Sequence, residues 1–347
     1  MYSLEYDIYT PLDSFHKYEH VGTELILGSM NEQEPFFSIM IPTYNRVDTI
    51  IAAVESALGQ IGFDNYEVVI ADNDPEGMNG ETKAFLTSLS SGKIRYYVNN
   101  KNIGMCGNWN RCIEMCRGKY IVMLHDDDML GPYCLKTLYE VILKSDHPTV
   151  LGVGYEVFGD NRRPQFYKPD KVSFQYINKK DFFFGESLNI AGMTFERDFI
   201  YKMGGFADEY YPNEDSYFIY QAIVHGRVVR IPYVLAGYRV EDNLSLKDDT
   251  LEKIIYMTEK MRENISLYEP FAKRFMEKYD LEYLYDYIQG ANRYWSANIS
   301  CESIFNRCDM RRRKINYFKL LYVKCFLFYY KKINNKKKNY QCFALEW

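Results

Sequence analysis

The sequence contains no run of about 20 uncharged apolar residues, so it predicts no membrane-spanning helix. Its first residues, MYSLEYDIYT, have neither a basic start nor an apolar segment, and we therefore expect no secretory signal. The eight cysteines are irregularly spaced and form no pair of CxxC motifs, so the sequence predicts no zinc site. We expect reduced thiols in a cytoplasmic protein.

The chain also lacks the excess of positive charge that favours nucleic acid as a partner, because its formal net charge is −5. Basic residues are concentrated in one segment. Residues 306–340 contain twelve Lys or Arg and one acid, Asp309, which leaves −16 (−5 minus 11) for the remainder. A basic aromatic segment is typical of a helix packed on its own domain, or of peripheral contact with anionic lipid headgroups. Both interpretations stay open, and we predict no nucleic-acid partner.

The chain does contain short apolar runs that alternate with helical patterns. Predominantly apolar runs occupy 36–42, 66–71, 94–98 and 120–124, and apolar residues at helical spacing lie between them at 47–58, 81–89 and 105–115. Apolar strands separated by helices predict a parallel sheet that is covered on both faces. Further along the chain we expect strands at 150–157 and 228–235 and helices over 250–287.

Polar loops follow each of the first four predicted strands. In parallel sheets, ligands bind at the carboxyl ends of the strands. This rule brings residues 42–45, 72–74, 99–104 and 126–128 to one edge. Four polar loops at one edge are a stronger indication of a site than any one of them alone.

Three adjacent carboxylates, Asp126, Asp127 and Asp128, follow the fourth strand and His125. Two like charges about 4 Å apart repel by roughly 4 kcal/mol at an effective dielectric near 20, so water or a cation should offset them. Mg²⁺ and Mn²⁺ prefer carboxylate oxygens, and Mg²⁺ is usually held by one or two carboxylates together with substrate phosphates. The alternative is a solvated loop, or an N-cap for a helix that begins near Pro132.

Two further acidic positions allow functional and structural interpretations. Asp72, at the end of the second strand, can accept a hydrogen bond from a pyrimidine ring or a ribose hydroxyl, but Asx turns are also common there. Glu214 and Asp215 precede an apolar helix, where carboxylates favourably complement the helix dipole. A carboxylate at that position can also act as a general base toward an acceptor hydroxyl.

The order of these segments carries a resemblance to a known family. SIMIPTYNR (38–46), VVIADND (68–74), NKNIGMCGNWNRCIEMCRGKYIVMLHDDD (100–128) and GGF…NED (204–215) together resemble glycosyltransferase family 2, whose fold is called GT-A. The resemblance covers about residues 36–245. It implies a mostly parallel, Rossmann-like α/β sheet with a nucleotide-binding half (36–130) and an acceptor half (131–245). An amino-terminal extension (1–35) and a helical carboxyl-terminal region (246–347) with the basic aromatic tail complete the chain.

The resemblance also implies a role for each motif residue. The nucleotide would be held by Pro42, Thr43, Tyr44 and Arg46, by Asp72 at the base, and by Asn102, Gly104 and Asn110 from a loop and helix that close over it. Asp126 would face the ribose, and Asp127, with Asp128 as a spare, would bind Mn²⁺ or Mg²⁺. Asp215, seconded by Glu214, would be the catalytic base.

Together these roles imply an inverting glycosyltransferase with a nucleotide-sugar donor, UDP-linked by expectation. The acceptor would be a hydroxyl of a glycan or of a lipid-linked saccharide, as in bacterial polysaccharide biosynthesis. Two departures, His125 in place of the first acid of the D-x-D cluster and Glu241 in place of a common histidine, keep open a non-catalytic nucleotide- or sugar-binding relative in a synthesis complex. A sugar nucleotidyltransferase would need a glycine-rich phosphate loop, and SIMIPTYNR has no glycine.

Overall fold

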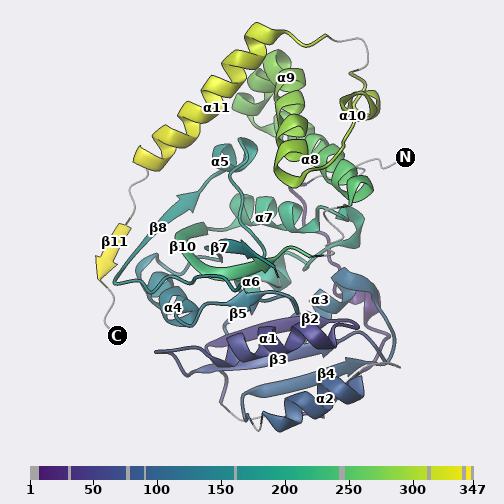
Figure 1. The fold of residues 1–347 in the computed structure, drawn as a ribbon, viewed down its shortest axis with the longest axis vertical. Helices are drawn as coiled ribbons and strands as arrows, with labels where there is room; N and C mark the ends of the chain where they lie inside the picture. The colour runs from purple at the N-terminus through teal and green to yellow at the C-terminus, as the bar shows by residue number, and fades with distance from the viewer. Residues whose placement is uncertain are drawn as a thin grey trace.

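The structure is a computed structural model that describes residues 8–29, 33–75, 79–89, 91–159, 162–241, 247–310, 314–337 and 341–344. The first four predicted strands form a parallel group in the order β4-β3-β2-β5. Their bounds are β2 (Phe37–Thr43), β3 (Tyr66–Asp72), β4 (Ile94–Asn99) and β5 (Tyr120–Met123). The expected Rossmann-like α/β sheet is confirmed, and Figure 1 shows it in the lower and middle parts of the molecule.

The sheet continues beyond β5 through both sequence halves. Antiparallel β9 (Thr194–Glu196) joins β5 to the parallel pair β7 (Val150–Phe158) and β10 (Val228–Arg239). Three more strands add antiparallel pairings: β6 (Met129–Leu130) and β8 (Lys171–Ile177) on β10, and β11 (Gln341–Ala344) on β8. One sheet therefore crosses the predicted division at residue 130.

Helices cover both faces of the sheet because side chains alternate along each strand. Ile39 and Ile41 of β2 belong to one apolar core, and Met40 between them belongs to another. The first core includes residues of α1 (Val47–Leu58), α2 (Asn79–Ser88) and α4 (Cys134–Lys144). The second includes residues of α3 (Gly104–Met115), α5 (Lys179–Phe183), α6 (Arg197–Lys202) and α7 (Glu214–His225).

The carboxyl-terminal region is helical, as expected. It consists of α8 (Asp248–Tyr268), α9 (Pro270–Trp295), α10 (Cys301–Arg307) and α11 (Tyr317–Lys337). Pro270 separates α8 from α9 because proline is tolerated in the first turn of a helix but not in its interior. In the part of the chain that the structure describes, no helix has both the length and the apolar character needed to cross a membrane.

Helix α11 lies along the outside of this helical region, against α9 (Figure 1). Its inner face buries Leu320 and Val323. Its outer face exposes Phe318, Leu321 and Phe328, which are 87%, 61% and 61% exposed. Residues 311–313 and 338–340 of the predicted basic tail lie outside the described residues.

Residues 8–22, here called the amino-terminal strap, connect distant parts of the domain. The Tyr9 hydroxyl lies 2.9 Å from that of Tyr220 in α7, and the Ser14 amide donates to the Gly204 carbonyl. The strap includes a short helix, η1 (His16–Tyr18), and leads into β1 (Thr23–Leu27), which pairs antiparallel with β4. The described part of the predicted amino-terminal extension is therefore attached to the domain, whereas residues 1–7 and 30–32 lie outside the described residues.

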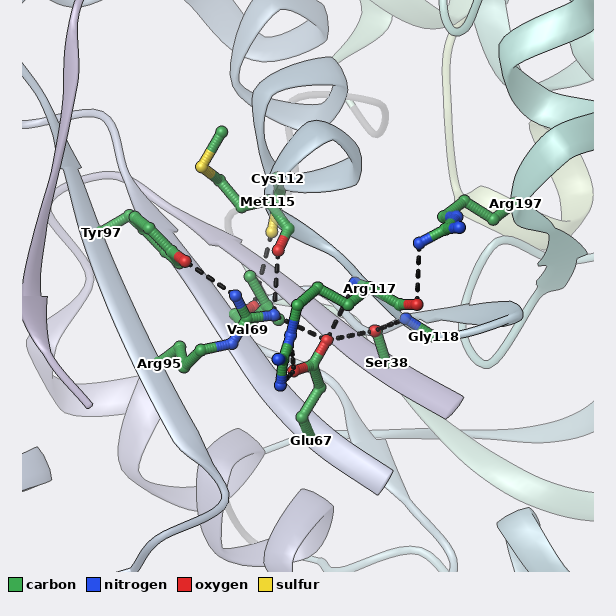
Figure 2. A network of polar contacts seen from close by, with 10 residues as sticks. All are labelled: Ser38, Glu67, Val69, Arg95, Tyr97, Cys112, Met115, Arg117, Gly118 and Arg197. Carbon is green, nitrogen blue, oxygen red and sulfur yellow. Dashed lines mark hydrogen bonds and ion pairs between the residues drawn. The ribbon is translucent and has the colours of Figure 1, made fainter. Parts of the chain in front are cut away.

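A buried ion-pair network holds together the amino-terminal ends of the central strands (Figure 2). Glu67 of β3 accepts from the Ser38 hydroxyl at 2.6 Å, and it pairs with Arg95 at 2.6 Å and Arg117 at 3.0 Å. Arg197 extends the network by donating to the Arg117 carbonyl. Since ligands bind at the opposite ends of such strands, this network is structural.

Candidate functional site

A cleft of about 600 Å³ opens at the carboxyl ends of the central strands. Its walls come from the β2–α1 loop, the start of α3, the end of β5, the start of α7 and the start of α8. Ten of the thirteen predicted site residues line it: Pro42, Thr43, Tyr44, Arg46, Asn102, Gly104, Asp126, Asp127, Glu214 and Asp215. The other three, Asp72, Asn110 and Asp128, are buried outside its lining.

The end of β2 and the loop that follows it are tied directly to the aspartate cluster. The Thr43 hydroxyl donates to Oδ2 of Asp126 at 2.7 Å, and Nη1 of Arg46 lies 2.5 Å from Oδ2 of Asp127. Burial raises the pKa of Asp126 to about 6, although the Thr43 hydrogen bond opposes the rise. The repulsion anticipated within the aspartate cluster is therefore reduced by a hydroxyl donor and a guanidinium of the protein itself.

His125 and Arg239 complete the surroundings of the cluster. Burial disfavours a charge on His125, but its hydrogen bond to Asp128 and the three aspartate charges outweigh this and raise its pKa to about 9. Its Nδ1 lies 3.4 Å from Oδ2 of Asp128, and its ring stacks on Trp109. The backbone amide of Arg239 donates to the Asp128 carboxylate, and the side-chain Nε of Arg239 donates to the backbone carbonyl of Asp127.

Potential metal ligands gather at the same place. Ligand atoms of His125, Asp127 and Asp128 all lie within 4.8 Å of one another. Nε2 of His125 has no hydrogen-bond partner among the described residues, and Oδ2 of Asp128 has only its ion pair with Nδ1 of His125. Two carboxylates suit Mn²⁺, because carboxylates are its preferred ligands, and His125 would join them in its neutral form, since neutral imidazole is a common ligand of divalent transition metals. The residues present therefore fit a divalent ion.

A network of side-chain amides shapes the side of the cleft that is formed by the ends of β2 and β3 and the start of α3. Asn73 donates to Asn102 at 2.9 Å and accepts from the Ile103 amide at 3.0 Å. Asn108 donates to the backbone carbonyls of Thr43 and Ala71, which joins α3 to the ends of β2 and β3. Asn73 and Asn108 were not among the predicted site residues. The sequence feature that could have identified them is an amide side chain at a strand end or on an otherwise apolar helix face.

Two predicted nucleotide contacts have structural partners instead of a place in the lining. Asp72 is 3% exposed, accepts from the Tyr96 hydroxyl at 2.7 Å and accepts from the Asp74 amide at 3.0 Å. Asn110 bonds both the amide and the carbonyl of Phe206 at 2.8 Å, which fixes the GGF segment against α3. The amide of Asn110 therefore positions the segment that leads into the proposed base.

Glu214 and Asp215 lie in the first turn of α7, on the opposite wall. Burial, reinforced by the charge of Asp215, raises the pKa of Glu214 to about 8, and its Oε2 has no hydrogen-bond partner among the described residues. Burial also raises the pKa of Asp215, and the Ser216 amide, which donates to Oδ1 at 2.6 Å, opposes that rise. The charge of His125 lowers the pKa of both carboxyls, so the two walls are electrostatically coupled.

The remaining wall is one that sequence motifs did not identify. This wall comes from the loop before α7, the end of β10 and the start of α8, which contribute Tyr211, Tyr238, Thr250 and Ile254. The side-chain amide of Asn213 also donates to the Thr258 hydroxyl, which connects the loop before α7 to α8. The helical carboxyl-terminal region therefore forms part of the site.

Comparison with known proteins assigns the class. Residues 38–204 match the model of the family described as glycosyl transferase family 2. This segment, 167 of the 347 residues, belongs to glycosyltransferase family 2 by that match. TarS residues 1–349 of S. aureus, solved in complex with UDP-GlcNAc, has the same GT-A fold. It gives a TM-score of 0.54 at 14% identity and covers 85% of this chain and 91% of that one.

Two curated relatives show how far sequence similarity extends. An uncharacterized glycosyltransferase of Rickettsia felis is 34% identical over 141 residues, which are 40% of this chain and 23% of that protein. The GalNAc(5)-diNAcBac-PP-undecaprenol beta-1,3-glucosyltransferase of Campylobacter jejuni is 26% identical over 224 residues, 58% of this chain and 68% of that protein. The chain thus spans less than a quarter of the length of the Rickettsia relative.

Proposed function

We propose that this protein is an inverting glycosyltransferase that moves a sugar from a nucleotide-diphosphate donor, a UDP-sugar, to a hydroxyl of a saccharide acceptor. One observation carries the proposal. A single cleft is lined by three sets of groups that are distant in the sequence: predicted nucleotide contacts, Asp126 and Asp127 of the aspartate cluster, and the Glu214–Asp215 pair. Family membership and the UDP-GlcNAc complex of TarS support the choice of donor.

The chain's own residues supply binding and proton transfer. Arg46, Asn102 and Gly104 lie where a nucleotide diphosphate would enter, and the Asn73 amide holds the Asn102–Gly104 loop in place. Asp215 accepts the proton of the acceptor hydroxyl, whose oxygen then attacks the anomeric carbon and displaces the nucleotide diphosphate. Attack on the face opposite the leaving group inverts the configuration, and a positioned carboxylate base contributes about 10²–10⁴ in rate.

Mn²⁺ or Mg²⁺ would be held by Asp127, with Asp128 and His125 beside it. When bound, such an ion stabilises the negative charge that develops on a diphosphate leaving group. Arg46 already contacts Asp127, so it lies where it can meet the same diphosphate charge.

The acceptor side favours a saccharide carried on a lipid, reached by peripheral contact with a membrane. The Campylobacter relative is named for a substrate on PP-undecaprenol. Helix α11 exposes aromatic and aliphatic side chains beside Lys319, Lys324, Lys331 and Lys332, which suits attachment to an anionic lipid surface. We propose this contact for the described part of residues 306–340.

The test measures melting temperature and turnover of the full chain. With UDP and Mn²⁺ together, the melting temperature should rise more than with either alone, because the ion and the diphosphate bind as one unit. UDP-sugar hydrolysis with Mn²⁺ should fall at least 100-fold in Asp215→Asn, with UDP binding retained. UDP binding without turnover, unaffected by Asp215→Asn, would instead identify a non-catalytic relative.

A further inference from the structure

One exposed aromatic surface adjoins the cleft and has no role in the reaction proposed above. Strands β7 and β10 are parallel, and their register pairs Tyr155 with Ala236 and Val157 with Tyr238. Directly paired residues of neighbouring strands, and residues two apart on one strand, have side chains on the same face. Tyr155, Val157 and Tyr238, here called the tyrosine platform, therefore share one face of the sheet.

The platform continues the lining of the cleft. Tyr238 lines the cleft itself, and the Tyr155 ring meets the Tyr238 ring edge-on, with ring centres 6.2 Å apart. Asn189 lies close enough to the Tyr155 hydroxyl to lower its pKa, and the next residue, Ile190, lines the cleft. Tyr155 and Val157 nevertheless remain 42% and 37% exposed, so a molecule that extends out of the cleft would meet them.

The helical region contributes a further aromatic side chain nearby. Tyr294 at the end of α9 is 68% exposed, and its ring packs edge-on against Trp295 at 4.5 Å. Burial raises the pKa of Tyr155, and the proximity of Tyr294 adds to this rise, which places the two phenols near each other. Tyr294 is therefore close enough to Tyr155 for their phenols to interact electrostatically, and like Tyr238 it lies outside the family segment 38–204.

We propose that the tyrosine platform binds a sugar ring of the acceptor that neighbours the ring carrying the attacking hydroxyl. This inference rests on the proposed function. Flat aromatic faces pack against the C–H faces of a pyranose, and phenol and amide groups at the edge bond its hydroxyls. Two phenols and one valine do not form the continuous apolar surface that a polyprenyl chain needs, so a saccharide is the better occupant.

The platform is tested with the labelled full chain on a printed array of mono- to pentasaccharides, in the presence of UDP and Mn²⁺. The wild type should retain some saccharides of two or more rings. Tyr155→Ala should lower those signals about tenfold, the effect expected of truncating an aromatic anchor. Val157→Ser, a second change on the platform, should weaken the same signals. Tyr155→Phe keeps the ring and should retain them.

The matched control is Tyr201→Ala, because Tyr201 is 40% exposed but stacks on Phe15 outside the cleft lining. Its array pattern should equal that of the wild type. Three results would overturn the platform: no saccharide retained by the wild type, signals unaffected by Tyr155→Ala and Val157→Ser, or retention only of probes with a long alkyl aglycone. Donor hydrolysis by the wild type, measured in parallel, tests the proposed function separately.

Discussion

Removing the charge of Glu67 should destabilise the protein more than removing most other charges. Glu67→Gln preserves shape but leaves Arg95, whose side chain is 3% exposed, without its carboxylate partner. Breaking a buried pair in this way costs about 3–5 kcal/mol, because the remaining charge stays desolvated and uncompensated. Loss of the ion pair with Arg117 should add less to this cost, because the Arg117 side chain is 19% exposed and reaches water. The expected loss is a large part of the ~5–15 kcal/mol that stabilises a typical domain.

Urea-induced unfolding measures this loss as a change in the free energy of unfolding. The matched control is Glu140→Gln, which breaks the i,i+4 pair with Lys136 on α4 and should cost about 0.5 kcal/mol or less. The double variant Glu67→Gln/Arg95→Met removes the orphaned charge and should recover part of the stability. A loss of unfolding free energy in Glu67→Gln no larger than that in Glu140→Gln would refute a strongly stabilising role for the Glu67 network.

Two further predictions concern the cleft and the outer helix. The pKa of Glu214 is raised from 4.5 to about 8, so between these pH values the folded state keeps a proton that the unfolded state loses. The contribution of Glu214 to the free energy of unfolding should therefore fall as pH rises from about 5 to 8, by up to ~1.4 kcal/mol per pH unit. Glu214→Gln should lessen that slope in urea titrations with chelator present, and an unchanged slope would contradict it. Phe318→Ser/Phe328→Ser should reduce co-sedimentation with anionic phosphatidylglycerol vesicles several-fold without lowering the melting temperature. Equal sedimentation of this variant and the wild type, or binding to neutral phosphatidylcholine vesicles alone, would argue against membrane contact through α11.

The centre of the sheet was predictable because its strands are buried on both faces. β2 to β5 appear as predominantly apolar runs, so their ends could be predicted within a residue or two. The positions of the loops that follow them could be predicted for the same reason. Strands at the margins could not be found this way. β1 is only partly buried, and β9 has three residues, so neither leaves a periodic pattern.

Within the site, sequence motifs located charged groups better than the groups that position them. The aspartate cluster and the Glu214–Asp215 pair are adjacent carboxylates, which are easily recognised in a sequence. Asn73, Asn108 and the platform residue Tyr155 are ordinary residue types whose importance depends on what lies opposite them in space. His125 is the clearest example: in sequence it replaces an expected acid, whereas in space it pairs with Asp128 and stacks on Trp109.

The amino-terminal strap limits how far the cleft can open. It is bound to α7 through Tyr9, to the GGF segment through Ser14, and to α3 where the Arg111 guanidinium donates to the Val21 carbonyl. β1 then fixes its far end to β4. Any motion that separates α7 from α3 and β4 must stretch or detach this segment, so residues outside the cleft lining limit how wide the cleft can open.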